Sequence, residues 1–162
     1  MTNEPPDALP PSMRERVPFL LFRTAEASHG LANAMLGELG LTARQVGILT
    51  LVSERAPMTQ TELGAELQID RTVMVDLIDG LEAKGLVERR RNPQDRRAFL
   101  IQPTPAGTEA KEAAIVLLDR QQAIFLEPLT ADERRLLADL LNRLFGAARA
   151  RRRVPGSKRR SG

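Results

Sequence analysis

The chain of 162 residues contains no cysteine, tryptophan or tyrosine, and only 3% of its residues are aromatic. Without cysteine, disulfides, thiolate nucleophiles and cysteine-ligated zinc are excluded. A core built without aromatic side chains must use Leu, Ala, Val, Ile and Met, a composition typical of packed helices. No apolar run approaches the roughly 20 residues of a membrane span. Since the polar start, MTNEPPDALPPSM, is unlike a secretory signal, we expect a soluble cytoplasmic protein without a membrane partner.

The positive charge of the chain is unevenly distributed. The formal net charge is +3 and the sequence pI is about 10.1. The last 14 residues, from Arg149, hold seven of the 24 basic residues and no acidic residue. Residues 1–148 therefore hold 17 basic and 21 acidic residues, a net charge of −4. The high pI reflects the C-terminal tail, so it does not by itself argue for nucleic-acid binding.

Apolar spacing and helix-capping residues predict a mainly helical chain. After a flexible arm over residues 1–17, a helix over 18–41 is expected to begin at Pro18 and to end at Gly40. Four later helix starts have threonine as the N-cap, and three of them have Gln or Glu three residues on, which forms a capping box. These starts are Thr42 with Gln45, Thr59 with Glu62, Thr104 before Pro105, and Thr130 with Glu133.

Residues 60–85 predict a helix-turn-helix. A short helix near 60–67 precedes a second helix that Asp70 caps and Gly85 ends. One face of the second helix is apolar, with Met74, Leu77, Ile78 and Leu81 at helical spacing. The opposite face carries Arg71, Thr72, Val75, Asp76 and Asp79. A short helix, a turn and a longer helix with an exposed N-terminal half are typical of DNA-binding units.

The exposed face of this second helix has two interpretations. Arg71 could donate to a guanine or a phosphate, and Thr72 and Val75 could contact thymine methyl groups. Phosphate contacts are expected from Gln60 and Thr61 at the start of the shorter helix. Against this, Asp76 and Asp79 would repel phosphates, and as solvated charges they fit an ordinary amphipathic helix equally well.

The segment that follows, VERRRNPQDRRAFLI, predicts two strands around the turn RNPQD. From Lys84 to Arg97 there are six basic and two acidic residues, a local charge of +4. A charge run is usually a solvated surface, but this one lies at a hairpin tip and consists mostly of arginine. The flat, weakly hydrated guanidinium suits insertion into a minor groove. Arg91 and Arg96 are expected to meet phosphates, so the hairpin favours DNA binding.

The order and spacing of these motifs closely resemble the MarR family of bacterial winged helix-turn-helix regulators, from about residue 19 to residue 148. The motifs are L-x-x-K-G-L-V-x-R at 81–89, D-x-R at 95–97 and T-x-x-G at 104–107. Two departures are local: Pro103 and Pro105 flank Thr104 where the family often has Leu and a charged residue, and the second helix is more acidic than usual.

The resemblance implies a mainly α fold with a small β-hairpin wing. It places a winged helix-turn-helix DNA-binding domain at 42–103 and dimerisation helices at 18–41 and 104–150. Beyond them, composition predicts a basic, disordered tail at 151–162. The resemblance further implies an obligate homodimer that acts as a repressor on a pseudo-palindromic site in double-stranded DNA. In the wing, the resemblance implies that Arg97 enters the minor groove and that Asp95 orients it through an ion pair.

The only histidine, His29, lies in the first long helix, near the place where family members bind small aromatic acids. With Arg23, it is a candidate for binding a small-molecule effector that releases the DNA. The plainer interpretation is a histidine on the helix surface or at an interface.

The two alternatives to a DNA-binding regulator are a protein-binding winged helix and an enzyme. An acidic recognition face would suit a winged helix that binds a partner protein without reading DNA sequence. An enzyme is disfavoured because the chain has no Cys, one His, no Gly-rich phosphate loop and no cluster of metal ligands. We therefore expect no catalytic residue, no metal and no cofactor.

Overall fold

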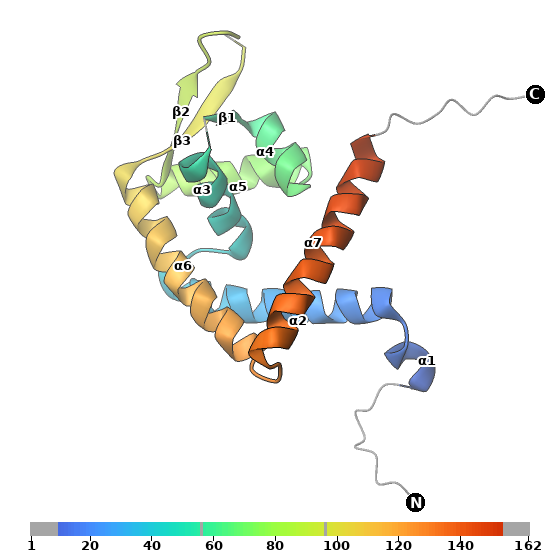
Figure 1. Cartoon of the computed structure of the whole chain (residues 1–162). Coiled ribbons are helices and arrows are strands. Elements are labelled where there is room, and N and C mark those ends of the chain that lie inside the picture. The colour runs from blue at the N-terminus through green and yellow to red at the C-terminus, as the bar shows by residue number, and fades with distance from the viewer. Residues whose placement is uncertain (1–9, 56, 96, 154–162) are drawn as a thin grey trace, which may run out of the picture. The chain divides into compact units, whose positions relative to one another are not determined.

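The computed structural model describes residues 10–55, 57–95 and 97–153. As predicted, the protein is mainly helical with a small antiparallel sheet (Figure 1). In chain order, the elements are α1 (Pro11–Arg14), α2 (Val17–Leu36), the 3-10 helix η1 (Gly37–Leu39), α3 (Ala43–Glu54), β1 (Met58–Thr59), α4 (Gln60–Leu67), α5 (Arg71–Ala83), β2 (Val87–Arg91), β3 (Phe99–Pro103), α6 (Pro105–Phe125) and α7 (Ala131–Arg153). The chain divides into two compact units, Met1–Gln122 and Ala123–Gly162.

Capping boxes start helices in both units, as predicted. The Gln45 amide donates to Thr42 Oγ1 at 3.3 Å, and the Thr42 amide donates to Gln45 Oε1 at 3.1 Å. At the start of α7, the Glu133 amide donates to Thr130 Oγ1 at 3.3 Å and the Thr130 amide to Glu133 Oε2 at 2.8 Å. Each box satisfies two amides that have no partner inside the helix, which explains why the helices begin where they do.

The core of the first unit is aliphatic, apart from one methionine. It contains Leu36, Leu41, Val46, Ile48, Leu49, Val52, Leu63, Met74, Ile78, Leu81, Val87, Ile101 and Ala114. Three of the four apolar residues predicted for one face of α5 are buried here, and the fourth, Leu77, packs against them. Because this face of α5 is buried, the opposite face is turned toward solvent.

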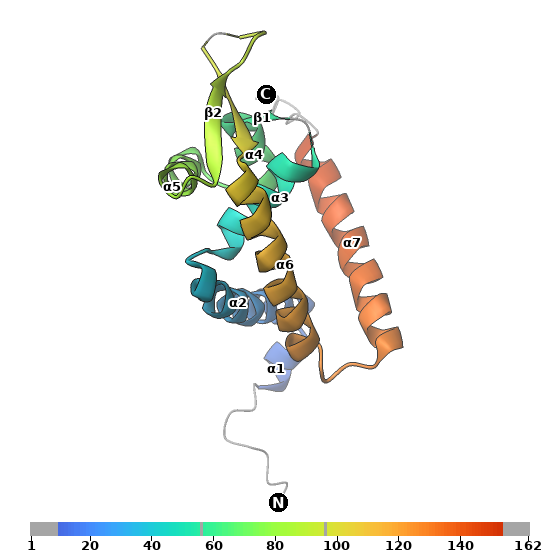
Figure 2. The same ribbon diagram turned by 90° about the vertical axis from the view of Figure 1, so that its left-hand side faces the viewer.

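The sheet has three antiparallel strands in the order β1-β3-β2. Val87 pairs with Pro103 and Arg91 with Phe99 across the predicted hairpin, which extends beyond α4 and α5 at its loop end (Figures 1 and 2). The sequence did not predict β1, which pairs Met58 with Ile101. A strand of two residues is too short to show an alternating pattern, and its formation depends on β3 being in place.

Thr104 and Gly107 attach the start of α6 to the turn between α5 and β2. The Thr104 amide donates to the Leu86 carbonyl at 3.1 Å, and the Thr104 hydroxyl donates to the Gly85 carbonyl at 2.7 Å. The same hydroxyl accepts from the Gly107 amide at 3.0 Å. Residues of the K-G-L-V motif therefore contact residues of the T-x-x-G motif directly, and this contact fixes the base of the hairpin to α6.

The N-terminal boundaries differ from those predicted. The helix expected over 18–41 is α2 from Val17 to Leu36, and η1 continues it to Leu39, where Gly40 ends it at φ 62°. The one-turn helix α1 falls within the predicted flexible arm. Residues 1–9 of that arm and residues 154–162 of the predicted tail lie outside the described residues.

The second unit consists mainly of α7, an amphipathic helix. Five of its large apolar side chains are exposed, and they recur along one side at helical spacing: Leu136, Leu140, Leu141, Leu144 and Phe145. On the same helix, Arg135 pairs with Asp132 and Arg143 with Asp139. No helix in the described parts of either unit is long and apolar enough to cross a membrane.

Candidate nucleic-acid interface

Thr59 determines where α4 begins. The Glu62 amide donates to Thr59 Oγ1 at 3.3 Å, and the Thr59 amide donates to Glu62 Oε2 at 2.8 Å. Hydrogen bonds from the Thr59 amide and then from its hydroxyl hold the pKa of the Glu62 carboxyl below its usual range. Gln60 and Thr61 therefore occupy the first turn of α4, where backbone amides and the helix dipole favour a phosphate.

Asp70 starts α5, which carries the predicted base-reading residues. Its Oδ1 accepts from the Thr72 amide at 2.8 Å. The preceding turn is tight, because the Ile69 amide donates to the Gly64 carbonyl at 2.9 Å and a Cβ on Gly64 would lie 3.2 Å from the Ile69 oxygen. Arg71 and Thr72 are exposed, so the start of α5 presents a cation and a hydroxyl to solvent.

Two side chains shape the loop of the hairpin. Asn92 Oδ1 accepts from the Gln94 amide at 2.9 Å, and Asp95 Oδ1 accepts from the Arg97 amide at 3.0 Å. The predicted role of Asp95 in orienting the Arg97 side chain stays a prediction, and the contact that forms is to the Arg97 backbone. No ion pair between these two side chains forms in the described part of the hairpin, where the Asp95 carboxylate instead accepts from the backbone amide two residues on. Asp95 therefore positions Arg97 through its backbone.

A cleft of about 470 Å³ lies among the starts of α4 and α5 and the hairpin. It brings together five of the predicted residues, Gln60, Thr61, Arg71, Val75 and Arg97. The rest of its lining is Thr59, Gly64, Ile69, Arg89, Ala98, Phe99 and Ile101. The starts of α4 and α5 thus form one surface with the hairpin. This surface carries Arg71 from α5 and Arg89 and Arg97 from the hairpin.

The other predicted DNA-binding residues lie apart from the cleft. Thr72 on α5 and Arg91 at the end of β2 are exposed but do not line it. Arg96 lies outside the described residues.

The two candidate effector residues are on α2 and do not line the cleft either. Both Arg23 and His29 are exposed, and Arg23 Nη1 pairs with Glu26 Oε2 at 2.8 Å. Among the described residues, no three His, Cys, Asp or Glu side chains gather as metal ligands would.

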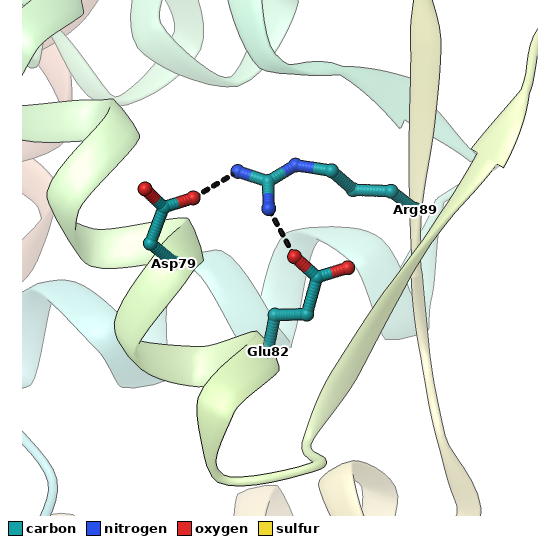
Figure 3. Close-up of polar contacts among 3 residues, drawn as sticks. All are labelled: Asp79, Glu82 and Arg89. Carbon is teal, nitrogen blue, oxygen red and sulfur yellow. Dashed lines mark hydrogen bonds and ion pairs between the residues drawn. The ribbon is translucent and has the colours of Figure 1, made fainter.

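Arg89 of β2 has a role that the sequence analysis did not assign. Its guanidinium pairs with both Asp79 and Glu82 of α5 (Figure 3). Partial burial lowers the pKa of Arg89, but the hydrogen bond to Asp79 and the charge of Glu82 outweigh it, so this pKa lies above its ordinary value. The interpretation of Asp79 as an ordinary solvated charge is therefore wrong. The sequence contained a signal for this bridge: Asp79 and Glu82 lie about one helical turn apart on α5, and the strand that follows runs back along this helix.

Several known proteins are similar to this chain in sequence and fold. The family model described as MarR family matches residues 39–98. The multiple antibiotic resistance protein MarR of Escherichia coli is 34% identical over 117 residues, which are 71% of this chain and 81% of that protein. A structure of a mutant MarR from E. coli complexed with operator DNA has a TM-score of 0.72 at 30% identity, and the match covers 79% of this chain and 94% of that chain.

A second solved structure contains a ligand. The PcaV transcriptional regulator from Streptomyces coelicolor in complex with its natural ligand has a TM-score of 0.74 at 28% identity. The match covers 87% of this chain and 98% of that chain. Two further bacterial relatives, 33% and 32% identical, are matched over 64% of their own length, so this chain spans less than two thirds of them.

Proposed function

Because this chain belongs to the MarR family, we propose that it is a sequence-specific DNA-binding transcriptional regulator that acts as a repressor. The observation that carries this proposal is the cleft, where Gln60, Thr61, Arg71 and Arg97 share one surface. A major groove is wide enough to admit a helix, and its base edges carry a distinct pattern for each base pair. With α5 in that groove, the hairpin beside it meets the adjacent backbone and minor groove.

Each interface residue has a distinct proposed role. Arg71 donates to a guanine or a phosphate, and Thr72 and Val75 contact thymine methyl groups. Gln60 and Thr61 bind a phosphate at the start of α4. Arg97 enters the minor groove with its backbone held by Asp95, and two further hairpin arginines, Arg91 and Arg96, meet phosphates.

The proposed assembly is a homodimer, formed by residues 18–41 and 104–150 around the DNA-binding domain at 42–103. Large apolar side chains are exposed on α2, with Val17, Leu20, Leu21 and Phe22, and on α7, as described above. On each of these two helices, a group of exposed apolar side chains indicates an interface. A two-fold dimer binds two half-sites about 34–36 Å apart, which requires a pseudo-palindromic operator.

Release from DNA is proposed to follow the binding of a small aromatic acid or phenol near Arg23 and His29. The PcaV structure, with its natural ligand, supports a ligand-binding role for this chain. A ligand that binds better to a dimer with the wrong half-site spacing shifts the population away from DNA. Since the proposed target is bacterial DNA, the proposed location is the cytoplasm, and no enzymatic activity is proposed.

The test is selection of bound fragments from a genomic library by the purified full-length chain. Recovery of a common pseudo-palindromic site supports the proposal, and the affinity for that site must fall steeply with added salt because bound counterions are released. Recovery of no enriched sequence would favour the alternative, in which the acidic α5 face binds a partner protein.

A further inference from the structure

The helix proposed to enter the major groove carries three acids along one line: Asp76, Asp79 and Glu82. Each would repel DNA phosphates if its charge were uncompensated. The side chains of Asp79 and Glu82 are 57% and 39% exposed, and the Arg89 side chain that pairs with both is only 23% exposed. Arg89 is thus directed toward α5 and is partly covered, unlike an arginine free to reach a phosphate.

The strand geometry explains this direction. Successive side chains in a strand point to opposite faces, so Val87 and Arg89 share one face of β2 while Glu88 and Arg90 share the other. Val87 is buried in the core, and Arg89 follows on the side that faces α5. Arg90 pairs instead with Glu88 of its own strand, at 2.6 Å.

Arg89 also lies where the two parts of the proposed interface, α5 and the hairpin, meet. It lines the same cleft as Arg71 of α5 and Arg97 of the hairpin loop. A guanidinium is a rigid fork, and binding two carboxylates with its two ends fixes both the distance and the rotation between the elements that it joins. The relative placement of Arg71 and Arg97 therefore depends on what holds the hairpin to α5.

We propose that Arg89 is a positioning residue for operator recognition: by bridging Asp79 and Glu82, it holds the wing at one fixed angle to α5. Its contribution is to selectivity, because the operator requires Arg71 and Arg97 to meet their grooves together, whereas non-specific DNA does not. Through the same two ion pairs, Arg89 also offsets the negative charge of Asp79 and Glu82 on α5. This inference rests on the proposed DNA-binding function and deepens it.

The first test needs no DNA. Amide hydrogen exchange is compared in the free full-length dimer for wild type, Arg89→Ala and the matched control Arg90→Ala. Arg89→Ala is expected to increase exchange in β2, β3 and the loop between them, because the hairpin loses its attachment to α5. Arg90→Ala removes an arginine from the adjacent position without touching that attachment, so it leaves exchange in β3 unchanged. Equal exchange in wild type and Arg89→Ala overturns the proposal.

The second test measures affinity for the selected operator and for a random duplex of the same length, over a series of salt concentrations. Arg89→Ala is expected to lower the ratio of operator affinity to random-duplex affinity about tenfold, a value between the effects of removing an exposed and a buried ion pair. The slope of log affinity against log salt concentration, the salt slope, is expected to change little. Arg90→Ala is expected to change the ratio less than about twofold.

The paired variant Asp79→Asn with Glu82→Gln decides between positioning and direct contact. Removing two negative charges near DNA raises non-specific affinity by simple electrostatics. If Arg89 acts through these acids, the same variant lowers operator selectivity by about as much as Arg89→Ala does, and adding Arg89→Ala to it has no further effect, as expected for residues that form one unit. If Arg89 binds a phosphate directly, neutralising the acids raises operator affinity and Arg89→Ala reduces the salt slope by about one. That result overturns the proposal.

Arg89→Lys keeps the charge if Arg89→Ala proves unstable. A single ammonium cannot span two carboxylates as a guanidinium does, so selectivity is expected to fall by about threefold while the salt slope stays at the wild-type value. Wild-type selectivity in this variant contradicts the bridge. If the wild-type protein itself selects no DNA, the proposed function fails, and the exchange experiment still tests the attachment of the hairpin.

Discussion

Gly107 of α6 packs directly on the peptide of Leu86. An ideal Cβ at position 107 would lie 1.8 Å from the Leu86 carbonyl oxygen and 2.8 Å from its carbonyl carbon, distances that no pair of nonbonded atoms tolerates. The same Leu86 oxygen accepts from the Thr104 amide, so neither partner can move away without breaking a hydrogen bond. This contact seats the hairpin base on α6 and explains the glycine of the T-x-x-G motif.

The first prediction concerns this contact. Gly107→Ala is expected to destabilise the protein by about 3 kcal/mol, because the added methyl group must displace backbone. Equilibrium urea unfolding measures the loss. Gly30→Ala on α2 is the control, since, beyond the adjoining residues of the helix, no atom of the same protomer lies within 4 Å of a Cβ placed there, and it should stabilise the helix by about 0.5–1 kcal/mol. A loss below about 1 kcal/mol at Gly107 would contradict the close contact.

The second prediction distinguishes two roles for Asp95. Its Oδ1 accepts a hydrogen bond from the Arg97 amide, and an asparagine offers an equivalent oxygen without the charge. Operator affinity is therefore expected to be retained in Asp95→Asn and to fall by about 1 kcal/mol in Asp95→Ala, the typical net value of one hydrogen bond. Equal losses of affinity in both variants would contradict this role and would favour an ion pair between the Asp95 and Arg97 side chains. Fluorescence anisotropy on a labelled operator provides the measurement.

The third prediction concerns Arg97, the hairpin arginine that lines the cleft. Arg97→Ala is expected to weaken operator binding by about 1–3 kcal/mol while the protein remains folded and dimeric. Arg44→Ala removes an exposed arginine that does not line the cleft and is expected to bind like wild type. If Arg97→Ala also binds like wild type, the assignment of the hairpin to a minor groove is wrong.

The fourth prediction tests the dimer. Leu144 is 54% exposed on the apolar side of α7, and a charge placed there would be buried unpaired in the proposed interface. Leu144→Asp is therefore expected to sediment as a monomer or to lose its helical signal. Asn142→Asp introduces the same charge on the same helix and should remain dimeric. A monomeric wild-type protein would refute the proposed assembly.

The fifth prediction is a pH dependence at the start of α4. The Thr59 amide and hydroxyl hold the pKa of the Glu62 carboxyl below that of the unfolded chain, which is about 4.3. The capping box thus contributes stability that is present above that pH and is lost as the pH falls through the lower folded pKa. Glu62→Gln keeps the geometry without the titration. The stability advantage of wild type over this variant should therefore shrink from about pH 7 to about pH 3, as measured by urea unfolding.

Local chemistry by itself determined most of the fold and part of the candidate interface. Thr42, Thr59 and Asp70 start helices because their side chains bond amides within three residues, and such contacts depend on no distant part of the chain. The apolar spacing of Met74, Ile78 and Leu81 likewise sets which face of α5 is exposed. Hence Arg71 and the basic hairpin were predictable as surface features from residue order alone.

Only the tertiary structure decided which of those surface residues act together. β1 forms because β3 presents an edge to Met58, and the bridge from Arg89 to Asp79 and Glu82 forms because the hairpin folds back along α5. Asp95 bonds the backbone of Arg97 because of the conformation of the turn, which residue order alone did not predict. A sequence specifies the charges of α5 and the hairpin, but whether an acid repels DNA or holds an arginine depends on distances that packing sets.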